Sequence, residues 1–181
     1  QTDLVQPGLR IPVTADGERF AAAADLGRSV IWLHTFGERF TDSEGRPEKP
    51  PRMPLGEAPR VPKAGAISQE SSEMPDTIDY DSVNRRLQVG GGYVENVSPE
   101  IWSYEVSGKQ VIRQWFSYRK GNRERPIMGG RRPPSKLGEI QPDQWLAEYT
   151  TELINVLNVI SLLVSLEPQQ ADLLEHICSG Q

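Results

Sequence analysis

The sequence predicts an α+β fold, built from an N-terminal helix, a small and mainly antiparallel sheet, and a pair of C-terminal helices. Two observations carry this prediction. Apolar residues recur every three to four positions near both ends of the chain, which is the period of a helix that buries one face. Between these segments, short β-branched and aromatic runs alternate with glycine-rich turns, which is typical of antiparallel strands. We expect residues 1–181 to form a single domain.

The N-terminal helix is predicted over residues 18–36. Asp16 precedes it and is of a type that caps helices. Phe20 begins an apolar face with helical spacing, and Gly37 follows as a natural terminator. His34 lies among apolar neighbours, so we expect an interior, hydrogen-bonded histidine there and not a catalytic base.

The middle of the chain predicts a loop followed by a hairpin. Residues 41–75 contain seven prolines and few apolar residues, which indicates a long loop wrapped over the surface. Short strands are then expected at residues 77–80, 86–89 and 93–97. Gly90-Gly91-Gly92 is expected to form the flexible turn between the last two.

A strand–Gly–helix unit is predicted next. Residues 101–106 alternate between apolar or aromatic and polar side chains, as in a half-buried strand. Ser107-Gly108 interrupts this pattern, and residues 109–118 then show helical spacing. Trp115 falls on the apolar stripe of this helix, so we expect it to pack in the core.

The C-terminal part, residues 139–178, is predicted to be helical. Pro142 suits a first helical position, residues 152–166 read as a core helix, and a second short helix is expected after Pro168. The longest apolar stretch, residues 153–166, is shorter than the roughly 20 residues that span a bilayer. We therefore expect a cytoplasmic protein that has no membrane partner.

Basic residues are concentrated in one window. The net charge of the chain is −5, yet residues 109–136 hold nine Lys or Arg and one Glu, a charge of +8 that leaves −13 for the remainder. Such asymmetry indicates a surface for a polyanion, in this case nucleic acid. The predicted DNA-binding residues are Lys109, Arg113, Arg119, Lys120, Arg123, Arg125, Arg131 and Arg132. Arg113 and Lys120 are positioned by the predicted helix and are expected to contact phosphates. Arg131 and Arg132 lie in a loop rich in Gly and Pro, and we expect them to read base edges.

The sequence predicts no catalytic centre, metal site or cofactor site. His176 and Cys178 are two residues apart, but no third group is available to orient them. Asp79 and Asp81 flank a tyrosine on a predicted strand and are expected to be solvated. A single cysteine is typical of a reducing compartment.

Several segments resemble a known family. Residues 101–120 (IWSYEVSGKQVIRQWFSYRK) are similar to the strand–Gly–helix region of target-recognition domains in DNA adenine methyltransferases fused to restriction nucleases. Flanking segments resemble the C-terminal specificity domain of type ISP restriction–modification enzymes. These are residues 10–20 (RIPVTADGERF), 32–40 (WLHTFGERF), 125–129 (RPIMG) and 145–153 (WLAEYTTEL).

This resemblance implies a long bacterial polypeptide in which a nuclease, an ATP-driven motor and an adenine methyltransferase precede this domain. Duplex DNA and the upstream methyltransferase domain would be its partners. S-adenosylmethionine and ATP with Mg²⁺ would be cofactors of the parent enzyme, and none is expected in this chain. Two alternatives stay open: an RNA-binding module, which would expose aromatic residues on a sheet, and a protein-docking domain that uses the helical tail.

Overall fold

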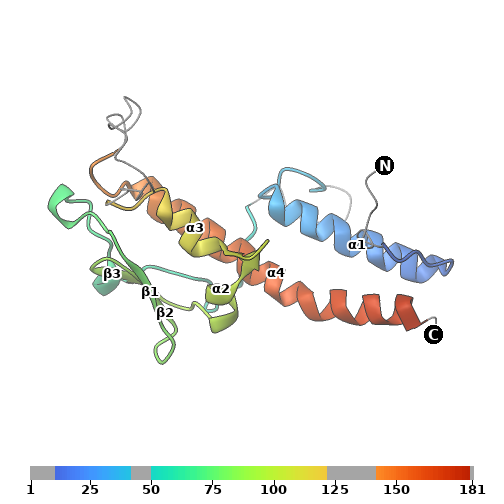
Figure 1. Cartoon of the computed structure of the whole chain (residues 1–181). Helices are drawn as coiled ribbons and strands as arrows, with labels where there is room; N and C mark the ends of the chain where they lie inside the picture. The colour runs from blue at the N-terminus through green and yellow to red at the C-terminus, as the bar shows by residue number, and fades with distance from the viewer. Residues whose placement is uncertain (1–10, 42–49, 122–141, 180–181) are drawn as a thin grey trace, which may run out of the picture. The chain divides into compact units, whose positions relative to one another are not determined.

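The computed structural model of the chain contains helices and a small antiparallel sheet, which confirms the predicted α+β class (Figure 1). The residues that the structure describes are 11–41, 50–121 and 142–179. The chain divides into two compact units. Unit 1 comprises Gln1–Pro50 and Leu162–Gln181, and unit 2 comprises Pro51–Ser161. That both units fold as one domain stays a prediction.

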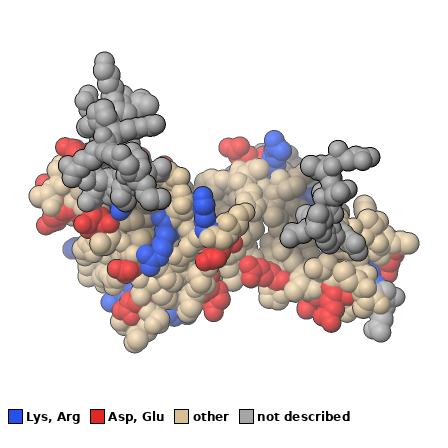
Figure 2. All heavy atoms as spheres, in the orientation of Figure 1, with Lys and Arg blue, Asp and Glu red and all other residues tan. Residues whose placement is uncertain are grey.

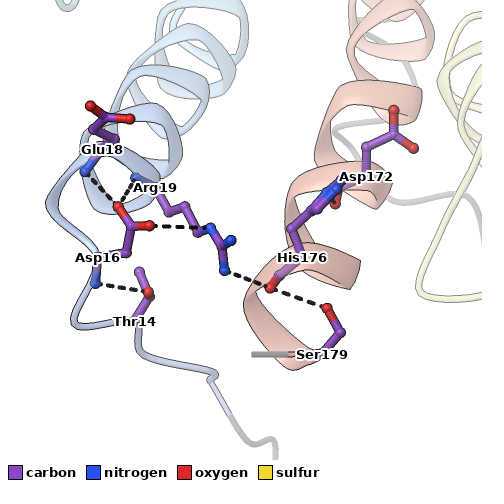
Figure 3. A network of polar contacts seen from close by, with 7 residues as sticks. All are labelled: Thr14, Asp16, Glu18, Arg19, Asp172, His176 and Ser179. Atoms are coloured by element: carbon purple, nitrogen blue, oxygen red, sulfur yellow. Dashed lines mark hydrogen bonds and ion pairs between the residues drawn. The ribbon is translucent and has the colours of Figure 1, made fainter. Parts of the chain in front are cut away.

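Unit 1 pairs the helix α1 (Gly17–His34) with the second half of the helix α4 (Ala147–Ser179). The two helices run antiparallel, so that the start of α1 lies beside the end of α4 (Figure 1). The Arg19 guanidinium joins these ends by donating a hydrogen bond to the carbonyl of His176 at 3.0 Å (Figure 3). Leu33 is buried on α1, whereas Phe20 keeps 63% of its surface exposed. A large apolar side chain on this helix pair is therefore left uncovered by the described residues.

Both ends of α1 agree with the sequence. The Asp16 carboxylate accepts hydrogen bonds from the backbone N–H groups of Glu18 and Arg19, at 2.9 and 3.1 Å (Figure 3). At the other end, Gly37 has a positive φ of 86°. Its N–H donates to the carbonyl of Trp32 at 2.8 Å, as expected for a glycine that ends a helix. The predicted cap and terminator are confirmed.

The prediction of two C-terminal helices is wrong, because α4 is one continuous helix of 33 residues with Pro168 inside it. Proline removes one N–H donor and crowds the preceding turn, but Pro168 is exposed, and the half-buried Leu173 and Ile177 extend the packed side of the helix beyond it. The packing of these side chains therefore outweighs the tendency of Pro168 to end the helix. Pro142 lies outside the helix and is not a first helical residue.

Among the described residues, α4 is the one helix that could cross a membrane by length and composition alone. A core helix has the same composition when its apolar face is buried. Leu153 and Leu157 of α4 have no exposed surface, and Ile160 is 3% exposed, so its first half is a core helix of unit 2.

The sheet of unit 2 contains β1 (Ile78–Asp81), β2 (Arg86–Val89) and β3 (Gly92–Val94), antiparallel in that order. Leu87 lies opposite Tyr80 on one side and Val94 on the other. The predicted strands and glycine turn are confirmed, although the third strand is shorter than expected. One face of the sheet packs in the core, and its side chains without exposed surface are Leu87, Val89 and Val94.

The described part of the proline-rich segment is packed onto unit 2 more closely than its composition suggests. Pro51, Pro59 and Pro75 are buried, and Ile67 is 8% exposed. The side-chain amide of Asn96 donates to the carbonyls of residues 56 and 58 at 3.2 and 3.1 Å. Buried prolines thus act as apolar anchors, which the sequence analysis did not expect.

The strand predicted at residues 101–106 is wrong. Its first half is the short helix α2 (Pro99–Ser103), and β4 (Glu105–Val106) is the remaining extended part. The Ser98 hydroxyl caps α2 by accepting from the N–H of Ile101 at 3.4 Å, with Pro99 at the first helical position. This Ser-Pro pair is a local signal for the start of a helix, and the prediction of a strand from the alternating pattern did not take it into account.

Candidate nucleic-acid interface

The basic window begins on a hairpin and a helix of unit 2. β4 pairs with β5 (Lys109–Gln110), and α3 (Val111–Ser117) follows directly. Ile112 and Phe116 of α3 are buried, as the predicted apolar stripe requires. Lys109 is exposed at the start of this unit. The hairpin therefore exposes the acidic Glu105, the apolar Val106 and the basic Lys109, while α3 holds it to the core.

Arg113 lies on an aromatic support. Its guanidinium carbon is 4.6 Å from the centre of the Trp102 ring system, and Trp102 stacks on Tyr80 at 5.8 Å with an interplanar angle of 18°. The Arg113 guanidinium is 3.8 Å from the Asp79 carboxylate, and the two side chains are 54% and 74% exposed. An ion pair that is this exposed, with its charged atoms this far apart, contributes little to stability. Arg113 is thus held in place by the ring and can exchange Asp79 for a phosphate.

The support beneath Arg113 is anchored in the core. The Tyr80 hydroxyl donates to the carbonyl of Val97 at 2.8 Å. Burial raises the pKa of Tyr80, and the Arg85 guanidinium opposes that shift. Tyr80 therefore keeps its proton and its hydrogen bond at neutral pH. The stack fixes Trp102, and Trp102 fixes the guanidinium above it.

Arg119 has a different environment. Its guanidinium carbon lies 4.3 Å from the Trp115 ring and 5.6 Å from the Tyr149 ring. Two of its nitrogens donate to one Glu152 oxygen, at 3.0 and 2.7 Å. Its side chain is only 24% exposed. Arg119 therefore joins the segment just after α3 to α4 within unit 2, and its binding of DNA stays a prediction.

Replacing Arg119 with alanine is expected to lower the free energy of unfolding by about 1–2 kcal/mol, because the charge-assisted hydrogen bonds and the ring contacts are lost together. Chemical denaturation of the variant measures the effect. Arg113→Ala is the matched control six residues earlier, on α3, and its cost is expected to stay within about 0.5 kcal/mol because its ion pair is exposed. Equal costs for the two variants would contradict this distinction.

The other predicted DNA-binding residues are placed in part. Lys120 is half-buried just after α3, where its N–H donates to the carbonyl of Phe116 at 3.0 Å. On the face drawn in Figure 2, basic side chains lie over the region of α3, with acidic side chains close by. The remaining predicted DNA-binding residues lie outside the described part of the chain, and their role stays a prediction. They are Arg123, Arg125, Arg131 and Arg132.

The histidines are both exposed. His34 is not an interior residue, because α1 turns its side chain away from the buried Leu33 next to it. The His176 ring nitrogen Nδ1 lies 2.6 Å from the carbonyl of Asp172 on the same helix. Cys178 is exposed two positions further, and residues so spaced on a helix do not face each other.

The two aspartates of β1 have separate partners. Asp79 lies near Arg113, whereas the Asp81 carboxylate accepts hydrogen bonds from the N–H groups of Val83 and Asn84 at 3.0 and 3.1 Å. Hydrogen bonds from Asn84 hold the pKa of Asp81 below its usual value. Among the described residues, no group of His, Cys, Asp and Glu side chains is arranged to hold a metal ion. Asp81 is a turn-forming residue of the β1–β2 hairpin.

Unit 2 carries a second basic cluster, which the charge pattern of the sequence does not predict. Arg86 and Arg60 both contact Glu95, at 3.0 and 3.3 Å, and Arg86 also stacks over Tyr93 at 4.3 Å. Arg60 is 70% exposed at its side chain. These arginines lie outside the charge-rich window, and only the strand pairing of unit 2 brings them together.

When the chain is compared with models of known protein families, one family matches. The model of the type ISP C-terminal specificity domain matches residues 1–155. No curated protein and no solved structure matches the chain. The matched residues include all of the described sheet, the β4–β5 hairpin and α3. A specificity domain provides target recognition in restriction–modification enzymes and is not itself catalytic. The chain belongs to the family of type ISP C-terminal specificity domains.

Proposed function

We propose that this chain binds a specific sequence of duplex DNA, as the recognition module of a bacterial enzyme that combines an adenine methyltransferase with an ATP-dependent nuclease. The observation that supports it most is Arg113. This guanidinium is exposed, is held over the Trp102 ring and, among the described residues, has only the weak carboxylate partner Asp79. An arginine so placed suits a phosphate or a guanine edge, both of which accept two hydrogen bonds from it.

The methyltransferase region of the same polypeptide is the proposed protein partner. Phe20 and Ile31 on α1 are 63% and 41% exposed, and Leu174 on α4 is 51% exposed. Unit 1 thus carries apolar surface that a neighbouring domain could cover. In this proposal S-adenosylmethionine and ATP with Mg²⁺ bind upstream, and the enzyme works in the cytoplasm without a membrane partner.

Binding to DNA is expected to weaken steeply as salt increases, because contact with phosphates releases counterions. Six phosphate contacts give a slope of log affinity against log salt of about −5. Arg113→Gln is expected to make this slope shallower by about one unit. Fluorescence anisotropy with a labelled duplex at several salt concentrations measures both values.

Arg28→Gln is the control, since it removes the same charge from unit 1, where Arg28 pairs with Asp25 at 2.7 Å. It is expected to leave the slope unchanged. Single-stranded RNA is titrated in parallel. Tighter binding to RNA than to duplex DNA would overturn the proposal, as would a slope near zero.

A further inference from the structure

We propose that the β4–β5 hairpin enters the major groove of the target DNA, where Val106 and Ser107 contact base edges. This inference rests on the proposed function and assigns part of the sequence readout to a particular element. The hairpin tip comprises Val106, Ser107, Gly108 and Lys109. All four residues are exposed, and 51% of the surface of Val106 is accessible.

The shape of the hairpin fits the major groove. It is a two-stranded ribbon in which Glu105 pairs with Gln110 and Val106 with Lys109. From the first pair to the turn it rises about 7 Å, which is two residues at roughly 3.4 Å each. The major groove is about 12 Å wide and 8.5 Å deep and admits such a ribbon, whereas the minor groove is only about 6 Å wide. The tip can therefore reach the base edges in the major groove alone.

The base of the hairpin is held by two hydrogen bonds to residues 102 and 104. The side-chain amide of Gln110 donates to the carbonyl of Trp102, and the N–H of Val111 donates to the carbonyl of Tyr104 at 3.0 Å. Trp102 is itself stacked on Tyr80. Side chains at the tip are thus presented from a fixed support, which lowers the entropy that binding would cost.

The turn residue Ser107 departs from the local rule. The turn has two residues, and both have positive φ, 52° at Ser107 and 72° at Gly108. Glycine, asparagine and aspartate are the residues that adopt this backbone at least cost. Serine at the first position offers a hydroxyl that both donates and accepts hydrogen bonds. A residue that costs stability at an exposed tip is consistent with a binding role.

The chemistry of the tip suits base edges flanked by phosphates. An exposed aliphatic side chain such as Val106 can contact the methyl group of thymine, and a serine hydroxyl can bond to any base. Lys109 and Arg113 add positive charge on the strand and the helix that continue from the tip. They suit the phosphates that border the groove.

The turn at Gly90 is less suited to this role. A Cβ atom at Gly90 would lie 3.0 Å from Pro75, so this turn is packed against the chain. A hollow of about 660 Å³ beside it is lined by Glu73 and Asp76 among others. Two carboxylates there would repel phosphates. The β4–β5 turn is exposed and is followed directly by Lys109, with Glu105 the one acid of the hairpin, and this exposure favours that turn instead.

The experiment selects duplexes from a randomised library with the complete enzyme that carries this chain, without ATP and Mg²⁺. Val106→Thr changes one methyl group to a hydroxyl, and Ser107→Gly removes the hydroxyl while suiting the turn. At one or two adjacent positions of the selected DNA sequence, each variant is expected to prefer the selected base about 10-fold less than the unsubstituted enzyme does. Its base preference at all other positions is expected to stay the same. Melting temperatures are expected not to fall below that of the unsubstituted enzyme.

The β1–β2 turn supplies matched controls with the same residue types. Ser82 and Val83 are exposed there, Val83 by 89%, and Ser82→Gly and Val83→Thr are expected to leave the selected sequence unchanged. An unchanged sequence in both tip variants would overturn the inference while the proposed function stands. Equal weakening on every duplex would also overturn it, because the hairpin would then contact only the backbone. If the unsubstituted enzyme selects no sequence, the proposed function fails and the inference fails with it.

Discussion

Replacing Trp145 with alanine is expected to lower the free energy of unfolding by about 3–5 kcal/mol, the usual cost of truncating a large core aromatic residue. Trp145 has no exposed surface. Its ring lies between the helices of unit 2, 6.2 Å from Trp115 and Phe116 and 5.4 Å from Tyr149. Its indole nitrogen donates to the Thr150 hydroxyl at 2.9 Å. The substitution thus leaves a cavity at the centre of the aromatic cluster.

Chemical denaturation followed by far-UV circular dichroism measures this loss. Trp115→Ala is the comparison, because Trp115 is only half-buried and contacts Trp145 from the edge of the cluster. We expect a smaller loss for it. If Trp145→Ala unfolds at the same denaturant concentration as the unsubstituted chain, the aromatic cluster does not hold unit 2 together.

Gly92→Ala is expected to destabilise unit 2 by about 1–3 kcal/mol or more, because the added methyl group has no space. A Cβ atom at Gly92 would lie 2.8 Å from the carbonyl oxygens of Gly65 and Ala66 and 2.8 Å from the Cα atom of Ile67. These are backbone atoms, which cannot rotate away as a flexible side chain does. The strand β3 and residues 65–67 would have to move apart.

Gly91→Ala provides the matched control one residue earlier. Among the described residues, no atom lies within 4 Å of a Cβ atom placed there. Its cost is expected to stay within about 0.5 kcal/mol, as for surface substitutions in general. The two variants are compared by their denaturation midpoints. Equal midpoints would contradict the close approach of residues 65–67 to β3.

The candidate interface could be predicted from the sequence only in part. The charge of residues 109–136 indicated which segment carries the basic residues. It could not distinguish Arg113 on α3 from Arg119, which lies two residues beyond the end of this helix. The first is exposed over Trp102, and the second is held by Trp115 and Glu152. That difference depends on which residues of distant segments surround each guanidinium.

Two predicted elements were wrong because a local pattern had a second interpretation. Alternation at residues 101–106 resembles a strand, yet the Ser98 cap begins a helix there. Pro168 normally ends a helix, but the apolar residues beyond it pack within unit 1, and the helix continues. In both places the free energy of tertiary packing is larger than the propensity of a few residues.

The sequence by itself determined the α+β class, the helix that begins after Asp16, the strands beside the triple glycine and the family. These follow from caps, turns and periodic burial, which act over a few residues. Only the tertiary structure decided the contacts between distant segments. The Asn158 side chain, 105 positions along the chain from Met53, accepts the N–H of that residue at 2.8 Å. No local pattern encodes such a partner, because it depends on how all the elements of unit 2 pack at once.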